Sequence, residues 1–136
     1  MYKVRGNNIY TMKRLIREFI KELSEKYIPN NLTKFFDINF SLDNHLAERL
    51  LERNINKKDF ESLVTGLIRD HLCEVIYLSL AYKRTRININ NKNGLLLGVT
   101  GTHYEDGNFI IKLHTCFTPN NRDGSKALIN TKNIYI

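Results

Sequence analysis

The sequence predicts an α+β fold in which helices come first and strands second. Apolar residues recur at helical spacing over residues 10–74, and from residue 84 onward apolar and polar residues alternate with the period of a strand. A run of helices followed by a run of strands is typical of α+β domains. We therefore expect N-terminal helices packed on a roughly four-stranded antiparallel sheet, in a single domain over residues 1–136.

The first helix is predicted over residues 10–27, and Pro29 ends it because proline cannot continue a helix. Its apolar stripe follows the spacing of a core-facing helix and consists of Met12, Leu15, Ile16, Phe19, Ile20, Leu23 and Tyr27. Residues 28–40 are expected to form a loop. Three phenylalanines are expected to anchor this loop to the core: Phe35, Phe36 and Phe40.

Two further helices are predicted before the strands. The second begins near Ser41 or Asp43, which are both good N-caps, and runs to about Arg53. The third begins after Asn56, which resembles the first residue of a capping box, and ends near Glu74.

The rest of the chain is predicted to be extended. Residues 75–82 are interpreted as a strand or an extended link, and residues 84–90 as a strand whose side chains alternate between two faces. Further strands are expected at 95–103, 109–117 and 127–136. Turn signals separate the strands at 90–94, 105–108 and 120–126. Gly98 and Gly101 are expected to mark bulges or close approaches of the backbone.

The overall charge favours a polyanionic partner. The chain has 21 Lys and Arg against 14 Asp and Glu, a formal net charge of +7, and nucleic acid is the first candidate for such an excess. The two cysteines, Cys73 and Cys116, have no metal-binding spacing and form no disulfide framework. No apolar run approaches the roughly 20 residues of a membrane span. We expect a soluble, intracellular protein with no contact with a membrane.

The second predicted helix carries a row of basic side chains beside its apolar ridge. His45, Arg49 and Arg53 follow one another at intervals of four residues, so they lie in line on a helix surface. A bound phosphate would relieve the repulsion along this row, and guanidinium is well shaped to bind one. A solvated helix edge, with Arg49 paired to Asp43 or Glu52, is the alternative interpretation.

The third predicted helix places a histidine on its core-facing stripe. Phe60, Leu63, Val64, Leu67 and Ile68 follow the buried spacing, and the next positions of that face are His71 and Leu72. We expect His71 to face inward where the two helices pack.

Together these residues suit acid–base chemistry on a phosphodiester. RNA supplies its own nucleophile, the 2′-hydroxyl, so an enzyme needs a base, an acid and fixed positive charge. Histidine can perform either proton transfer near neutral pH. The predicted catalytic residues are His45, Arg49 and His71, and no metal or cofactor is expected because no carboxylate cluster is visible.

The segments "DNHLAERLLERNI" and "GLIRDHLCEV" resemble the phage endoribonuclease RegB family. The first matches the family's His-Leu-x-x-Arg-x-x-x-Arg helix through His45, Leu46, Arg49 and Arg53. The second matches its Asp-His-x-x-Glu-Val helix through Asp70, His71, Glu74 and Val75. The likeness covers about residues 40–135.

The resemblance implies a RelE/YoeB-like fold and metal-independent cleavage of messenger RNA to a 2′,3′-cyclic phosphate. It implies purine-rich ribosome-binding sites of early phage transcripts as the substrate, the cytoplasm of a host bacterium as the location, and a small-subunit ribosomal protein as a helper. His45, Arg49 and His71 correspond to the family's catalytic residues. A family glutamate in the first helix corresponds to either Glu18 or Glu22.

Further cations could bind the RNA backbone. Besides Arg53, the predicted strands carry Arg84, Arg86 and Lys112, which form either a basic floor for phosphates or a solvated sheet face. His114 alternates with Lys112 and lies on either the polar or the helix-facing side of the sheet. A noncatalytic regulator that binds RNA or protein on the same fold is the alternative function.

Overall fold

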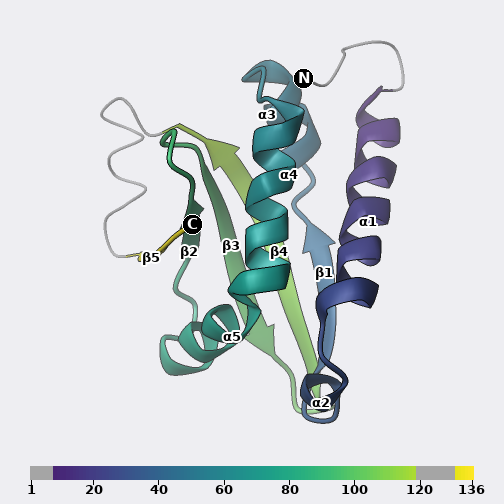
Figure 1. Ribbon diagram of the computed structural model, residues 1–136, viewed down its shortest axis with the longest axis vertical. Helices are drawn as coiled ribbons and strands as arrows, with labels where there is room; N and C mark the ends of the chain where they lie inside the picture. Colours follow the sequence, from purple (N-terminus) through teal and green to yellow (C-terminus); the bar gives the residue numbers. More distant parts are fainter. Residues whose placement is uncertain (1–7, 119–130) are drawn as a thin grey trace.

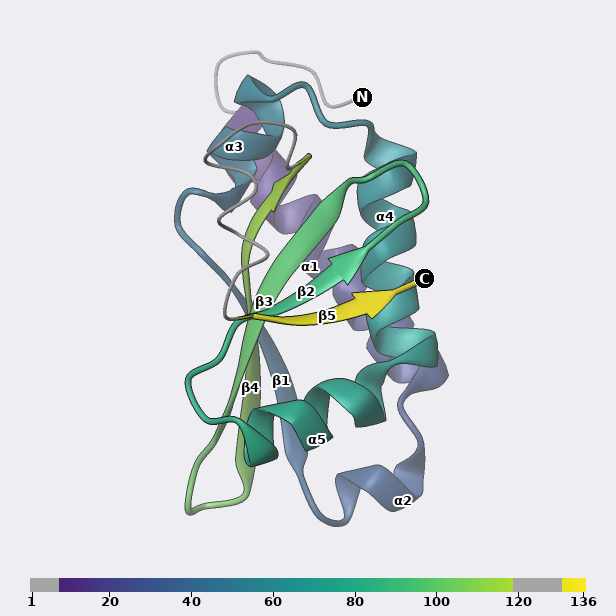
Figure 2. The ribbon, with the colours of Figure 1, turned by 90° about the vertical axis from the view of Figure 1, so that its left-hand side faces the viewer.

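The computed structural model of the protein describes residues 8–118 and 131–136. Its helices and strands form an α+β architecture, as the sequence predicts. Figures 1 and 2 show the helices α1, α4 and α5 over one face of a sheet, with α3 at one end of it. We call the opposite face of the sheet the open face.

The first helix, α1 (Asn8–Tyr27), has the predicted amphipathic stripe. Met12, Ile16, Ile20 and Leu23 are buried against the core, and Pro29 lies just past the end of the helix. The single-turn helix α2 (Asn30–Thr33) follows.

Residues 28–40 do not form the loop that the sequence suggested. They contain α2 and most of strand β1 (Asp37–Leu42), because the alternation of Ile38, Phe40 and Leu42 is the pattern of a half-buried strand. Phe36 and Phe40 pack on the core as expected, whereas Phe35 is exposed.

The second predicted helix begins later than expected. Ser41 belongs to β1, Asp43 lies in a turn, and α3 spans Leu46–Glu52 with His45 as its N-cap residue. Within α3, Leu46 and Leu50 are buried.

The third predicted helix is found, but it contains a turn of π-helix. Helix α4 (Lys57–Thr65) begins at Asn56, whose side chain accepts from the backbone N–H groups of Lys58 and Asp59. The π-turn η1 (Gly66–Asp70) follows, and α5 (Leu72–Ala81) then runs in a clearly different direction (Figures 1 and 2).

The prediction of a strand or extended link at residues 75–82 is wrong. Val75, Ile76 and Ser79 are buried, Leu78 is half-buried and Tyr77 is exposed, which is a helical pattern. The β-branched and aromatic composition favoured a strand, but packing of α5 on β3 decided the outcome.

The sheet has five strands rather than four, and it is mixed rather than antiparallel. Its order is β1-β4-β3-β2-β5. The remaining strands are β2 (Ile87–Asn90), β3 (Leu96–His103), β4 (Asn108–Phe117) and β5 (Lys132–Tyr135). β1 is parallel to β4 and β5 is parallel to β2, while β3 is antiparallel to both of its neighbours. The predicted turn at 120–126 and the start of the last predicted strand lie outside the described residues.

The hairpin between β3 and β4 forms at Asp106-Gly107, as predicted. Gly107 has φ of 94°, a conformation that favours glycine, and the backbone N–H of Tyr104 donates to the carbonyl of Asn108. Further along, the register shifts by one residue at Gly98/Val99, where His114 is the additional residue of β4. This bulge confirms the expectation at Gly98.

Among the described residues, no helix has both the length and the apolar composition that crossing a membrane requires.

Candidate active site

A group of polar side chains gathers where β1 ends beside β4 and α3. It consists of Asp43, Arg49, Lys112 and His114, together with the backbone N–H of His45 at the start of α3, and we call it the Asp43 cluster. β1 positions Asp43, because the register Leu42↔Leu113 continues as a hydrogen bond from the Asp43 N–H to the Leu113 carbonyl. The bulge in β4 then presents His114 on the open face beside it.

Asp43 connects the two histidines of the cluster. Its Oδ1 accepts from the backbone N–H of His45 at 2.9 Å, and its Oδ2 lies 3.7 Å from Nδ1 of His114. The His45 N–H is the main reason that the pKa of Asp43 lies below its ordinary value, and the charges of Lys112, His114 and Arg49 lower it further. Asp43 is therefore a carboxylate at neutral pH.

His114 is the more enclosed of the two histidines. Its side chain is 18% exposed, and its Nε2 lies 2.6 Å from the hydroxyl oxygen of Thr100. Burial lowers the pKa of His114 below its ordinary 6.5, Arg86 and Lys112 lower it further, and Asp43 opposes them. His114 is thus neutral near pH 7, and a proton on Nδ1 points toward Asp43 while Nε2 accepts from Thr100.

His45 is open to solvent. Its side chain is 64% exposed, and its Nδ1 lies 3.2 Å from Oε2 of Glu48, which leaves Nε2 directed away from that pair. Arg49 is half-buried one helical turn further along α3, and it adds positive charge next to Asp43. His45 and Arg49 therefore lie together, as the helical spacing suggested.

The four cations predicted to bind RNA have different surroundings. Lys112 belongs to the Asp43 cluster, and Arg86 lies close enough to lower the pKa of His114. Arg84 instead lines a cavity beside the end of α5. Arg53 is engaged within the fold, since its Nη1 donates to the Thr115 hydroxyl at 3.1 Å and to the Cys116 carbonyl at 3.0 Å.

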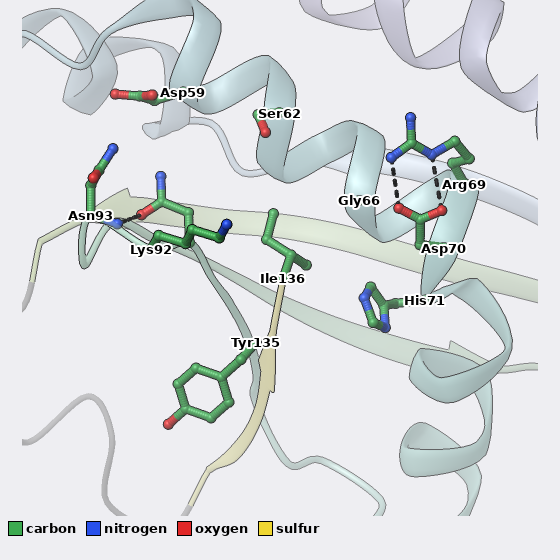
Figure 3. A pocket seen from close by; sticks show the side chains of 11 residues that line it. Asp59, Ser62, Gly66, Arg69, Asp70, His71, Lys92, Asn93, Tyr135 and Ile136 are labelled. Atoms are coloured by element: carbon green, nitrogen blue, oxygen red, sulfur yellow. Dashed lines mark hydrogen bonds and ion pairs between the residues drawn. The ribbon is translucent and has the colours of Figure 1, made fainter.

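His71 lies in a separate cavity of about 660 Å³ (Figure 3). Figure 3 shows His71 next to the Arg69–Asp70 ion pair, and Ile136 lines the same cavity. Its Nδ1 lies 3.1 Å from Oε1 of Glu74, and its side chain is 26% exposed. The π-turn moves His71 off the buried stripe, which continues instead through Leu72.

The structure does not bring His71 to the Asp43 cluster. The cavity of His71 is bounded by Tyr135 of β5, whereas His45 follows β1, and these strands are the opposite edges of the sheet. Four strand spacings separate those edges, which is about 19 Å. The two histidines therefore belong to different sites on the molecule.

Sequence reasoning missed Asp43 and Thr100 as partners of His114. The alternation of Lys112 with His114 did indicate a shared face, but the bulge that settles which face it is cannot be seen in the sequence. Glu18 and Glu22, the two open candidates in the first helix, line a different cavity with Phe19 and Lys57.

Metal ligands and cysteine thiols are two further sources of reactivity in a protein. In the ranges 8–118 and 131–136, no three His, Cys, Asp or Glu side chains lie close enough together to hold a metal ion. Burial raises the pKa of the Cys116 thiol to about 12, so this cysteine is not a nucleophile at neutral pH.

Comparisons with known proteins add no relative. No family model, no curated protein and no solved structure matches the chain.

Proposed function

We propose that the protein is a metal-independent endoribonuclease and that the Asp43 cluster is its catalytic centre. The observation that carries the proposal is that one carboxylate lies beside the ring of the neutral, half-enclosed His114 and accepts from the backbone N–H of the exposed His45, among several cations. Cleavage of RNA by its own 2′-hydroxyl is promoted by a base, an acid and fixed positive charge, and these residues can supply all three.

His114 acts as the base in this proposal. It is neutral near pH 7 because of burial and the neighbouring cations, and Asp43 orients its ring. The base removes the 2′-hydroxyl proton, either directly at Nε2 or through the Thr100 hydroxyl that occupies Nε2 in the free protein. The 2′-oxygen then attacks the adjacent phosphorus and forms a 2′,3′-cyclic phosphate.

His45 acts as the acid. Its ring is exposed to solvent and held at Nδ1 by Glu48, so Nε2 can donate a proton to the leaving 5′-oxygen. Arg49 and Lys112 supply the positive charge that stabilises the pentacoordinate transition state. No step needs a co-reactant other than RNA.

The RegB-like motif supports messenger RNA as the substrate, purine-rich ribosome-binding sequences as the target, and a RelE/YoeB-like fold. It also supports a small-subunit ribosomal protein as the helper and a bacterial cytoplasm as the location. In this proposal His45 and Arg49 keep the roles that the motif implies, and His114 replaces His71 as the second histidine, because His71 lines a separate cavity.

Incubation of the protein with a purine-rich RNA in EDTA tests the function. We expect cleavage to persist without divalent metal and to leave a 2′,3′-cyclic phosphate and a 5′-hydroxyl, which mass spectrometry of the fragments detects. A requirement for magnesium, or a 5′-phosphate end, would contradict the proposal. RNA binding without any cleavage would favour the noncatalytic regulator instead.

A further inference from the structure

A second cavity, of about 580 Å³, lies beside the Asp43 cluster at an edge of β3 that no described strand covers. Strand β2 pairs with β3 only as far as Ile87↔Val99, so in the described part of the chain Thr100–His103 are paired on the β4 side alone. The end of α5 and the segment that follows it form the other wall, through Ser79, Leu80, Lys83 and Arg84. Its volume falls within the roughly 300–1,000 Å³ of ligand pockets.

The backbone of β3 presents a donor and an acceptor to this cavity. Tyr104 exchanges hydrogen bonds with the β4 side of the hairpin, whereas the Leu95 carbonyl accepts from Asn91 on the β2 side. Because the two sides alternate along an antiparallel strand, the N–H and C=O groups of Gly101 and His103 point toward the uncovered edge. Gly101 lines the cavity, so its amide and carbonyl are available there.

The charge of the cavity favours a ligand that carries phosphate. Lys83, Arg84 and His103 line it, and no described acidic residue does. Arg84 has φ of 64°, an unusual conformation for a residue with a side chain, which marks a tight turn of the backbone at this wall of the cavity. An edge of four residues with two cations beside it suits a nucleotide better than an added peptide strand.

His114 connects the cavity to the proposed catalytic centre. It lines the cavity together with Thr100, and on its other side it faces Asp43. A nucleotide whose base occupies the cavity would therefore place its own phosphate near the Asp43 cluster.

We propose that this cavity is a nucleobase subsite for single-stranded RNA, a proposal that rests on the proposed function. The base enters edge-on, and its neighbouring donor and acceptor pair with the carbonyl and amide of Gly101. Lys83 and Arg84 bind the adjoining phosphate. The subsite selects which bond of the RNA reaches His45 and His114.

The first test is an NMR titration of ¹⁵N-labelled protein with the four nucleoside 3′-monophosphates. The amides of Gly101 and His103 should shift, and those of Thr100 and Thr102, which face β4, should shift less. Ribose 5-phosphate and inorganic phosphate should not reproduce the shifts. Equal shifts with either control would overturn base recognition. A dimer that forms without nucleotide and protects the Gly101 and His103 amides from hydrogen exchange would also overturn it.

Matched charge variants locate the phosphate contact. Arg84→Asn keeps a residue that tolerates the left-handed backbone and should weaken nucleotide binding by about fivefold. Lys92→Ala removes a positive charge from the cavity of His71 and should leave the affinity unchanged. An equal loss in both variants would show that the effect is one of net charge alone and would overturn the assignment.

The second test separates the subsite from the proposed function. The wild-type protein is given a series of RNA substrates, each with one abasic nucleotide at a different position. Cleavage should be lost only for the substrate whose abasic nucleotide lies next to the cut bond. If the RNA is cut equally at every abasic position and the amides do not move, the subsite is wrong and the nuclease stands. If nucleotides shift the amides but no RNA is cut, the nuclease is wrong and the cavity remains a nucleotide site.

Discussion

At the scale of single residues, the environment of His114 distinguishes it from the other histidines of the described chain. It is enclosed by Thr100 and Asp43 and faces two further cations, Arg86 and Lys112. His45 and His71 each pair with a glutamate three residues later, at 3.2 and 3.1 Å, on the surface of a helix terminus. The residue type alone therefore did not reveal which histidine is enclosed among charged and hydrogen-bonding partners.

The lowered pKa of His114 predicts how stability depends on pH. The folded state disfavours the charged imidazole, so the unfolded state binds more protons as the pH falls below the ordinary value of 6.5. This contribution to stability is complete above that pH and is lost as the pH falls through the lower folded pKa. His114→Gln should flatten the decrease in melting temperature between pH 7 and pH 5.

The control for this experiment is Thr102→Ala, which removes no titratable group and should keep the wild-type pH dependence. Asp43 does not change the melting temperature between pH 7 and pH 5. Its pKa is lowered from 3.8, so its contribution to stability is lost only at more acidic pH. An unchanged slope in His114→Gln would show that the histidine is not held neutral.

Arg53 is expected to matter for stability more than for RNA binding. Its guanidinium donates two hydrogen bonds to β4 and lies over the ring of Phe117 at 5.4 Å, so it fastens the end of α3 to the sheet. Arg53→Ala should lower the free energy of unfolding by about 1–3 kcal/mol, the range for hydrogen bonds with a charged donor. Denaturant titration measures this, and a stable variant with weakened RNA binding would instead restore Arg53 to the RNA-binding residues.

At the scale of elements, the sequence predicts α1, the start of α4 and the β3–β4 hairpin well, because periodicity, the Asn56 cap and the Asp-Gly turn act locally. It predicts α3 as well, but places its start too early. It fails where tertiary contacts outweigh local preference. α5 is helical because it packs on β3, and β1 was hidden in an expected loop because its partner β4 lies far along the chain. The π-turn shifts His71 by part of a turn, and no local signal marks that insertion.

The close approach of α5 to β3 depends on Gly101. A Cβ atom added there would collide with the Ser79 hydroxyl oxygen and lie 2.9 Å from the Phe109 ring. Gly101→Ala should therefore lower the free energy of unfolding by about 1–3 kcal/mol, as for overpacked cores.

A double-mutant cycle with Ser79→Ala isolates the cause of this effect. Removing the Ser79 hydroxyl takes away one of the colliding atoms, so the double variant should recover part of the loss. Strictly additive effects, measured by denaturant titration, would show that the hydroxyl is not what limits the approach.

At the scale of the whole molecule, the order of the sheet decides which predicted residues can act together. The sequence correctly places His45 beside Arg49, because both lie on one helical turn. The sequence interpretation groups His71 with these two residues because the consecutive helices were expected to pack side by side. In the structure, α3 lies next to β4, whereas His71 lies near β5 at the other edge of the sheet. The parallel pairing of β1 with β4, which the expected meander does not contain, instead brings Asp43 beside His114 near the start of α3.

The most direct test is single-turnover cleavage of a purine-rich RNA in EDTA by three matched variants, His45→Ala, His114→Ala and His71→Ala. The first two should cut at least about 100-fold more slowly, the usual loss of a general acid or base. His71→Ala should stay within about threefold of the wild type, less than 1 kcal/mol of barrier. Thermal melts check that each variant is folded. Loss of cleavage in folded His71→Ala, with His114→Ala fully active, would contradict the assignment of the catalytic centre to the Asp43 cluster.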